Sequence, residues 1–554
     1  MNTQLNSLLI VIALAANAFG QHDPGRNAVR HLAREQTDAA VKLVATAPNI
    51  MNSPISDAER CFVLVMAACQ QGDVTAAFNY AKQAVDNGLP IERLQAGPRD
   101  ILEPLYAHGE FQTWMKTRQK ELMHGPMLGS LSDSSASFWI RTTGETDVQV
   151  IAQAKNEPGT KPATGKKKTS SKADYTATVK ISGLKPSTRY SYNVLVNNKQ
   201  TGTSFEFRTF PKQQTPSCFS VAFGGGAGFT PQHERMWTSI GKRAPIALLL
   251  LGDNVYIDDP LHQMTQRYCY YRRQSQPEWK QLVASTSVYS IYDDHDFGMD
   301  DCIPGPEIEA PTWKRKVWDI FTQNWNNPAY GGGKEQPGCW YDFFIGNVHF
   351  IMLDGRYYRD LQGSSMLGPV QKAWMCDRLK SSPGVFKVLV SPVPWSPGVK
   401  PGSKDSWDGF PAEREEIFSL IEEHRIDGVV LMAADRHRSD LRKIRRPKGY
   451  DLFELMSSRL TNVHTHDLMK NAKGSEFIMG YNKECSFGLV EFDTAADDPW
   501  MKYSIVNIDN EVIDSRSLKL SQLCNNQKKS PSEQPDGEAT SEPAPGAAPE
   551  APHP

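Results

Sequence analysis

The stretch LLLLGDNVYIDD, from Leu248 to Asp259, decides the fold of this chain. An aliphatic run without polar alternation is typical of a strand that is buried on both faces of a sheet. The run stops at Gly252-Asp253, and an Asn, a Tyr and two further acids follow. A strand suited to a dry core therefore ends in a group of oxygen ligands.

Strand-like and helix-like segments alternate around this stretch, from Cys218 to about Val512. The expected strands are apolar, and the expected helices carry apolar residues at helical spacing. The strands are expected at 218–224, 245–253, 287–294, 348–356, 386–393 and 428–435, and the helices at 232–243, 368–381 and 411–425. This order predicts an α/β layered domain with ligands at the carboxyl ends of its strands.

The chain has 554 residues, and since a domain takes about 100–200 residues, several domains are expected. Composition divides it into five parts. These are an export signal over 1–20, a helical region over 21–124, a β-sandwich over 125–212, the α/β domain over 213–522 and a disordered Pro/Ala/Glu-rich tail over 523–554. The signal is inferred from a short apolar run that ends in small residues, and it predicts a periplasmic or extracellular protein.

The helical region has a capping box at Ser56 and Glu59 and a break at Gly72-Asp73. A similar break at Gly109-Glu110 suggests two units of a tetratricopeptide-type repeat. Two units need a neighbouring domain for stability. The pattern favours either a surface for a protein partner or a structural helical appendage, and the sequence leaves both open.

Strand periodicity begins after about residue 125. The segment 183–196, which contains Tyr190 and Tyr192, is similar to the closing strand of a fibronectin type III-like sandwich, including a tyrosine-corner position. The lysine-rich segment 161–172 is interpreted as a solvated loop, because it lacks the interleaved aromatics of a nucleic-acid surface.

Overall charge and cysteine content exclude several classes. The formal net charge is −2, which gives no general attraction to nucleic acid or anionic membrane, so no sequence-specific nucleic-acid binding is expected. No second segment has a transmembrane pattern. The nine cysteines include no C-x-x-C pair, which argues against a zinc–thiolate site. Two interpretations stay open: a disulfide between Cys302 and Cys339, or burial of all the thiols as small apolar groups.

Polar groups gather where four of the expected strands stop. Carboxylates, two histidines, a tyrosine and two arginines follow these strands: Asp253, Tyr256, Asp294, His295, Asp300, Asp354, Arg356, Arg359, Asp435 and His437. Carboxylates packed together require compensating charge. Oxygen ligands with imidazole suit Ca, Mn, Fe or Zn. Two such ions generate hydroxide and clamp the oxyanions of an in-line displacement at phosphorus, and arginines add phosphate recognition.

At these residues a family is recognisable. The segments GDNVY, YDDHDFG, LDGRYYR, DSWDGFPAERE and ADRH together resemble the PhoD-like alkaline phosphatases and phosphodiesterases of the calcineurin-like metallophosphoesterase superfamily. The resemblance covers roughly 126–495, because the family also places a small β-sandwich before the catalytic domain. It implies a metallophosphoesterase fold with two or more metal ions, Fe and Ca in the family, at the strand ends.

The resemblance also implies roles for single residues. Asp253 would bridge two metals, Tyr256 would bind the iron-like site as a phenolate, and Asp435 with His437 would complete the ligand shells. Asp300 stands five positions after His295, where the family has a metal-binding Asn. Asp294 and His295 would lie near the leaving group, which His295 could protonate. Arg356, with Arg359, would hold phosphate.

The chain departs from the family at the first strand. Gly226 occupies the place of a cysteine that binds iron in the family, which puts iron in doubt. The glycine run at Gly225 and Gly226 offers two interpretations: backbone N–H groups that approach phosphate, or a tight strand-to-helix turn. His464 and His466 form an H-x-H that is interpreted as a metal ligand pair or as part of a pocket rim or surface.

These residues predict an exported phosphoesterase that hydrolyses phosphate esters by metal-activated hydroxide attack. One alternative is a phosphodiesterase that acts on lipid, nucleic-acid or cell-wall phosphodiesters. Another is a secreted binding protein with a degenerate metal site, which the missing cysteine favours and the retained Asp253, Asp435 and His437 oppose.

Overall fold

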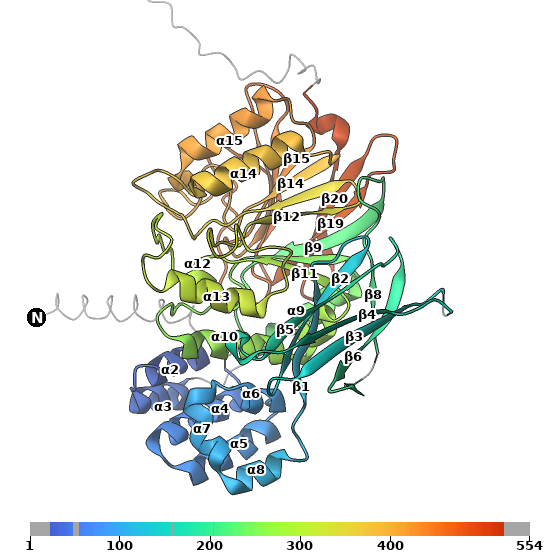
Figure 1. Ribbon diagram of the computed structural model, residues 1–554. Helices are drawn as coiled ribbons and strands as arrows, with labels where there is room; N and C mark the ends of the chain where they lie inside the picture. The colour runs from blue at the N-terminus through green and yellow to red at the C-terminus, as the bar shows by residue number, and fades with distance from the viewer. Residues whose placement is uncertain (1–22, 48–54, 158, 203, 526–554) are drawn as a thin grey trace, which may run out of the picture.

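A computed structural model describes residues 23–47, 55–157, 159–202 and 204–525 (Figure 1). The expected export signal over 1–20 and most of the expected tail over 523–554 lie outside these ranges. Within them, no helix combines the length and apolar character needed to cross a membrane.

Two large sheets form the body of the protein. The first contains nine strands in the order β21-β20-β19-β9-β10-β11-β1-β2-β5. Their bounds are β1 Leu122–Gly129, β2 Ser135–Thr142, β5 Thr176–Ser182, β9 Cys218–Gly224, β10 Ala247–Leu251, β11 Ser287–Ile291, β19 Ser486–Asp493, β20 Trp500–Asn507 and β21 Val512–Lys519.

The second sheet contains seven strands in the order β12-β13-β14-β15-β17-β16-β18. Their bounds are β12 Tyr341–Ile345, β13 Val348–Met352, β14 Phe386–Val390, β15 Val429–Ala433, β16 Ser439–Ile444, β17 Leu452–Ser457 and β18 Glu476–Tyr481. Aromatic side chains join the two sheets: Tyr289 stacks on Phe343 with ring centroids 3.8 Å apart, and Phe386 lies 5.8 Å from Phe492.

The strands expected from aliphatic runs are confirmed. β9, β10 and β11 pair in parallel, as do β13, β14 and β15. Helices cover the sheets, with α14 and α15 beside β14 and β15 in Figure 1. The helices of this part are α9 Arg235–Lys242, α10 Gln263–Ser275, α11 Pro277–Val283, α12 Asp294–Phe297, α13 Lys314–Asn324, α14 Gly368–Ser381 and α15 Pro411–Glu423, and the 3-10 turns are η2 Pro231–His233, η3 Trp407–Gly409 and η4 Leu520–Leu523.

The N-terminal region is helical, as expected. It contains α2 Pro24–Leu32, α3 Thr37–Thr46, α4 Asp57–Gln71, α5 Val74–Asp86, α6 Ile91–Ala96, α7 Arg99–Ala107 and α8 Gly109–Met115. Gly72 ends α4 at φ +79°, a left-handed conformation that glycine adopts without strain. Ser56 caps α4 by accepting from the Glu59 N–H, but the Glu59 carboxylate turns away to Arg93, 2.9 Å distant. Only half of the expected capping box therefore forms.

The β-rich segment after the helices is joined to the nine-stranded sheet. β1, β2 and β5 extend the nine-stranded sheet, because β1 pairs in parallel with β11 at Gly129 and Val288. The remaining strands form a second, smaller sheet, in which β8 pairs with β6: β3 Asp147–Ala154, β4 Ala163–Lys168, β6 Arg189–Val196, β7 Lys199–Gln200 and β8 Phe205–Arg208, with the 3-10 turn η1 Ser171–Ala173 nearby. The hydroxyl of Tyr190 accepts a hydrogen bond from the Lys185 N–H at 2.9 Å, which is the contact of a tyrosine corner.

Two local expectations were wrong. The lysine-rich segment 161–172 contains the edge strand β4, which pairs with β3. Its lysines face solvent, which is a common way to protect an edge from further pairing. The suggested Cys302–Cys339 disulfide is absent, since all nine cysteines lie among the described residues and all are free. Cys339 is buried where its N–H binds Asp354, and packing accounts for it.

Asp174 joins three parts of the chain. Its carboxylate contacts Arg99 of α7, Arg141 of β2 at 2.9 Å and Arg267 of α10 at 3.0 Å. It is 4% exposed. Although burial alone raises the pKa of this carboxyl, the three arginines hold it below its usual value.

We predict that Asp174→Ala lowers the free energy of unfolding by about 3–5 kcal/mol, because it leaves buried guanidinium groups without a counter-charge. The midpoint of urea denaturation measures the effect. Asp147→Ala is the matched control, since Asp147 and its partner Lys166 are both half exposed and such pairs contribute about 0–1 kcal/mol. Equal midpoints for the two variants would contradict this account of the junction.

Candidate active site

The carboxyl ends of the parallel strands meet at one edge of the two sheets, and there the backbone is strained. Asp253, Tyr256, Asp435 and His437 have φ values of +54°, +50°, +67° and +45°. This left-handed region disfavours residues with a Cβ and costs about 1–3 kcal/mol at each such residue. Strain that recurs at four predicted ligands indicates that the fold holds these side chains in place for a purpose other than stability.

Asp253, Tyr256 and His437 form one connected group. The Tyr256 hydroxyl lies 3.1 Å from Asp253 Oδ2 and 2.7 Å from His437 Nε2. All three residues are buried. Burial raises the pKa of Asp253 well above its usual value and lowers that of His437 well below its own. In the absence of a cation the site therefore disfavours the charged form of each.

Asp253 also belongs to a second group, with Asp294 and His295. One ligand atom of each lies within 4.8 Å of the others. Asp294 begins α12 and accepts a hydrogen bond from the Asp301 N–H at 2.6 Å. The sequence placed these side chains at the ends of different strands, and the fold brings them together around Asp253.

The surroundings of His295 favour its charged form. Its Nδ1 lies 2.5 Å from Asp258 Oδ1, and its ring stacks on Tyr256 with centroids 4.5 Å apart. Burial alone lowers the pKa of His295, but Asp258, Asp294 and Asp253 together raise it well above the usual value. A protonated imidazole at the edge of the ligand cluster is suited to donate a proton to a leaving group.

Sequence reasoning missed Arg26, which reaches the site from the N-terminal helix α2. Its Nη1 lies 2.5 Å from Asp258 Oδ2 and donates to the Tyr256 carbonyl at 2.9 Å. The helical region therefore touches the residue that orients His295. No local signal could have revealed this contact, because Arg26 and Asp258 are 232 positions apart.

Asp296 stabilises the GDNVY turn through hydrogen bonds to its backbone. Its carboxylate accepts hydrogen bonds from the N–H groups of Asn254 and Val255, each at 2.9 Å. Burial raises the pKa of Asp296 to about 6. Asp296 positions the loop between Asp253 and Tyr256. Both of its carboxylate oxygens are engaged in these hydrogen bonds.

Arg356 and Arg359 are placed differently from the expectation that they hold phosphate. Both side chains are fully buried. Arg356 contacts Asp293, Asp294 and Asp405, and Arg359 Nη1 lies 2.7 Å from Asp405 Oδ1. The two guanidinium groups compensate the charge of buried carboxylates. Nη2 of each has no hydrogen-bond partner among the described residues, and a phosphate role for the pair stays a prediction.

Asp300 lies toward the rim, whereas the Asp435 side chain is mostly buried. The Asp300 side chain is 80% exposed, and Oδ1 lies 3.7 Å from His295 Nε2. It forms a third candidate metal group with Asp294 and Asp301. Asp435 Oδ2 has Lys400 Nζ as a charged neighbour at 3.6 Å.

The glycine run is a packing feature. The Gly225 N–H donates to the Ser457 carbonyl at 3.2 Å, so it is not available to a phosphate. Gly226 has φ +66°, and a Cβ there would lie 2.8 Å from the backbone nitrogen of Arg459. Gly226 is therefore needed for a close backbone approach, and a cysteine at this position would collide with the 458–462 loop. Phosphate binding by the Gly226 N–H stays a prediction.

The ligand groups fit a cation. Asp253 Oδ1, Asp435 Oδ2 and His437 Nδ1 are buried without a hydrogen-bond partner in the described part of the chain. A buried polar atom without a partner costs about 1–3 kcal/mol. Oxygen and imidazole donors of this kind are ligands of divalent and trivalent metals, which would satisfy all three.

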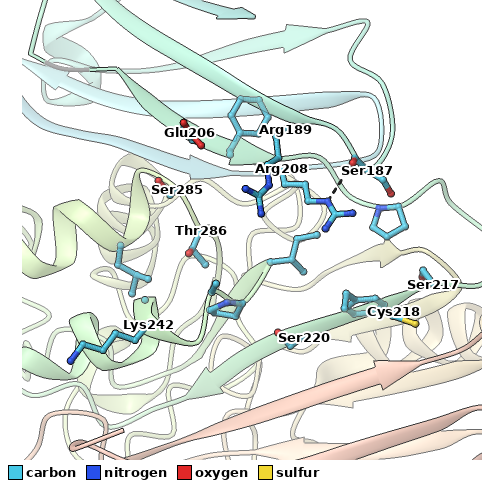
Figure 2. Close-up of a pocket in the computed structure, with 18 of the residues that line it drawn as sticks. Ser187, Arg189, Glu206, Arg208, Ser217, Cys218, Ser220, Lys242, Ser285 and Thr286 are labelled. Carbon is cyan, nitrogen blue, oxygen red and sulfur yellow. Dashed lines mark hydrogen bonds between the residues drawn. The ribbon is translucent and has the colours of Figure 1, made fainter. Parts of the chain in front are cut away.

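A cavity of about 1050 Å³ lies elsewhere, between the small sheet and α9 (Figure 2). Arg189, Arg208, Lys242 and Cys218 are among the residues that line it, and none of the predicted site residues is. The chemistry is at the strand ends, so this cavity is not taken as the active site.

The fold and the strand-end groups define a class of protein. A solved structure titled "Structure of PhoD" superimposes with a TM-score of 0.60 at 16% identity, covering 72% of this chain and 90% of that one. A purple acid phosphatase, PPD1 from yellow lupin (Lupinus luteus) seeds, gives a TM-score of 0.56 at 13% identity, covering 72% and 75%. The fold is thus similar to that of these two proteins.

The sequence profile described as PhoD-like phosphatase matches residues 221–498, half of the chain, and the chain belongs to that family. A second profile, described as a domain of unknown function (DUF7800), matches residues 119–215.

Two curated relatives match over shorter stretches. Alkaline phosphatase D of Bacillus subtilis (strain 168) is 32% identical over 120 residues, which cover 18% of this chain and 21% of that protein. Purple acid phosphatase 15 of Arabidopsis thaliana is 25% identical over 193 residues, covering 32% and 34%. These matches span about a fifth and a third of the relatives' lengths.

We predict that Asp258→Asn lowers the pKa of His295, because it removes the carboxylate that faces Nδ1. NMR titration of the metal-stripped protein, labelled with ¹⁵N at histidine, measures the value. Asp300→Asn should shift it less, since that carboxylate is exposed and 3.7 Å away. A larger shift in Asp300→Asn than in Asp258→Asn would contradict the assigned order of the two contacts.

Proposed function

We propose that the protein is a metal-dependent phosphoesterase that hydrolyses phosphate esters. The observation that carries the proposal is the meeting of Asp253, Tyr256 and His437 with Asp294 and His295 at the strand ends. Membership of the PhoD-like phosphatase family supports it.

Asp253, Tyr256 and His437 are proposed to hold one metal ion, and Asp253 with Asp294 a second. Asp435 and the exposed Asp300 are proposed as further ligands. When bound, such ions neutralise charge on the phosphate and make a water a better nucleophile at neutral pH. Ca and Fe, the metals implied by the resemblance, are the first to seek by elemental analysis.

The chain's own residues orient the reaction. His295 is proposed to donate a proton to the leaving oxygen, with Asp258 keeping its ring in position through Nδ1. Tyr256 stacks on the same ring and restricts its rotation. Arg356 keeps Asp294 ionised: burial alone raises the pKa of this carboxyl, but Arg356 and His295 lower it below the usual value.

The proposed organisation keeps the five parts expected from the sequence, with the 125–212 segment as a fibronectin III-like module that shares its sheet with the catalytic part. Export is also proposed, supported by the apolar N-terminal run. The N-terminal residue of protein secreted by a heterologous host, read by mass spectrometry, tests cleavage after Ala18 or Gly20.

We predict that Asp253→Asn and His437→Ala each lower kcat/KM for p-nitrophenyl phosphate by at least about 100-fold. Both should also lower the metal content of the purified protein. Asp147→Asn, the same change at a half-exposed carboxylate on β3, should leave activity and metal content unchanged.

Wild-type activity in the Asp253→Asn and His437→Ala variants would contradict the proposed metal-dependent mechanism. So would less than one metal ion per chain in an inactive wild type, which would favour a binding protein with a degenerate site. Parallel assays with bis(p-nitrophenyl) phosphate show whether monoesters or diesters are the better substrates.

A further inference from the structure

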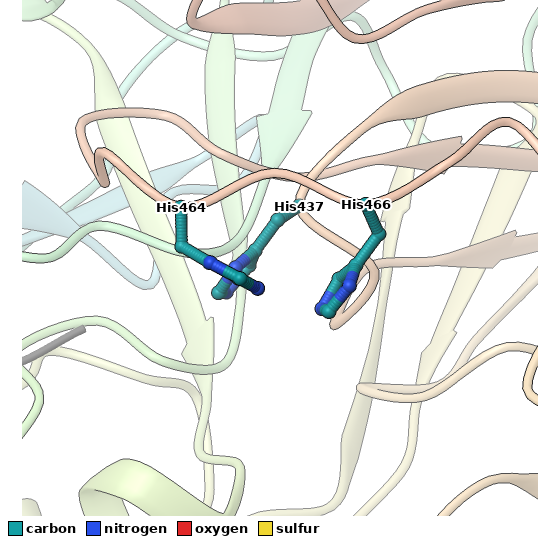
Figure 3. A group of neighbouring side chains, drawn as sticks. All are labelled: His437, His464 and His466. Carbon is teal, nitrogen blue, oxygen red and sulfur yellow. The ribbon is translucent and has the colours of Figure 1, made fainter. Parts of the chain in front are cut away.

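Three histidines meet beside the proposed active site. His437 follows β15, and His464 and His466 come from the loop after β17 (Figure 3). One ring nitrogen of each lies within 4.8 Å of the others. The ring centroids are 5.3 Å apart for His437 and His464, 5.5 Å for His437 and His466, and 4.5 Å for His464 and His466. Figure 3 shows all three rings on the same side of the loop.

Hydrogen bonds fix the loop that carries the H-x-H. The Thr465 hydroxyl lies 3.1 Å from the carbonyls of both His437 and Asn482. The Asn482 side chain donates to the His466 carbonyl at 3.0 Å. The residue between the two histidines is thus tied directly to the backbone of the third, so the convergence of the rings is a property of the fold.

Gly226 allows this loop to approach. Its carbonyl accepts hydrogen bonds from the N–H groups of Thr461 and Asn462 at 3.3 and 3.2 Å. A Cβ at position 226 would lie 2.8 Å from the nitrogen of Arg459 and 2.9 Å from Ser458 Oγ. Any side chain there would displace the segment that precedes the H-x-H.

Ring nitrogens in this group are left without partners. His437 Nδ1 and His464 Nε2 are buried and make no hydrogen bond among the described residues. His437 is 6% exposed, whereas His464 and His466 are partly exposed, which leaves a path for a small ion from solvent. A buried ring nitrogen without a hydrogen-bond partner destabilises the fold unless a ligand binds it.

We propose that His437, His464 and His466 form a three-imidazole site for a divalent transition metal. Imidazole suits Zn, Cu, Fe and Ni, whereas Ca takes oxygen ligands. Tyr256 lies on the other edge of the His437 ring, 2.7 Å from Nε2, and connects this site to Asp253. The site rests on the proposed function because it shares His437 with the proposed metal centre, and it adds a nitrogen-rich ligand set beside that centre.

Zn²⁺ binding to the metal-stripped, full-length protein tests the site. Affinity is measured by competition with a chromophoric chelator, and the number of imidazole ligands by X-ray absorption at the zinc edge. We predict that His464→Ala and His466→Ala each weaken Zn²⁺ binding by at least about tenfold and remove one imidazole from the spectrum. His424→Ala, at the exposed C-terminal end of α15, is the matched control and should change neither.

Unchanged affinity and imidazole count in both His464→Ala and His466→Ala would overturn the site. The His→Gln variants at both positions, checked by circular dichroism, replace any alanine variant that fails to fold. Asp253→Asn, measured in parallel, separates the two proposals. Full hydrolysis in Asp253→Asn contradicts the proposed role of Asp253 in hydrolysis and not the histidine site. Loss of hydrolysis there, with wild-type zinc binding in both histidine variants, contradicts only the histidine site.

Discussion

The structure depends on how buried carboxylates are neutralised at the strand ends. Parallel strands deliver their acids to one edge, where like charges repel and burial removes water. Arg356 compensates part of this negative charge, because it contacts Asp293, Asp294 and Asp405. Lys400 does the same for Asp405 and Asp435. What these cations leave uncompensated, above all around Asp253, is where a metal would bind.

The parts outside the catalytic sheets contribute to the same balance. Arg26 of the first helix pairs with Asp258, and Asp258 in turn faces His295. Asp174 ties α7, β2 and α10 together through three arginines. The helical region therefore stabilises the site through ion pairs, which favours the structural interpretation of these helices. A protein partner at that surface stays a prediction.

Much of the fold could be predicted, because its local signals are strong. An aliphatic run such as Leu248–Leu251 has few alternatives to a buried strand, and the segment 368–381 forms α14 as expected. Edge strands were harder: β4 is hydrophilic, and only its pairing with β3 makes it a strand. The link between β1 and β11 joins segments 159 positions apart at Gly129 and Val288, beyond the reach of periodicity.

The sequence by itself determined which residue types stand at the strand ends, since a polar residue after an apolar run marks the edge of a sheet. Tertiary structure decided what each one does. The sequence predicts Arg356 and Arg359 as phosphate ligands. In the structure both are buried and compensate the charge of carboxylates. The sequence places His464 and His466 in a loop, and the fold brings both beside His437. The physical reason is that charge compensation and ligand geometry depend on distances between distant segments, which no local pattern contains.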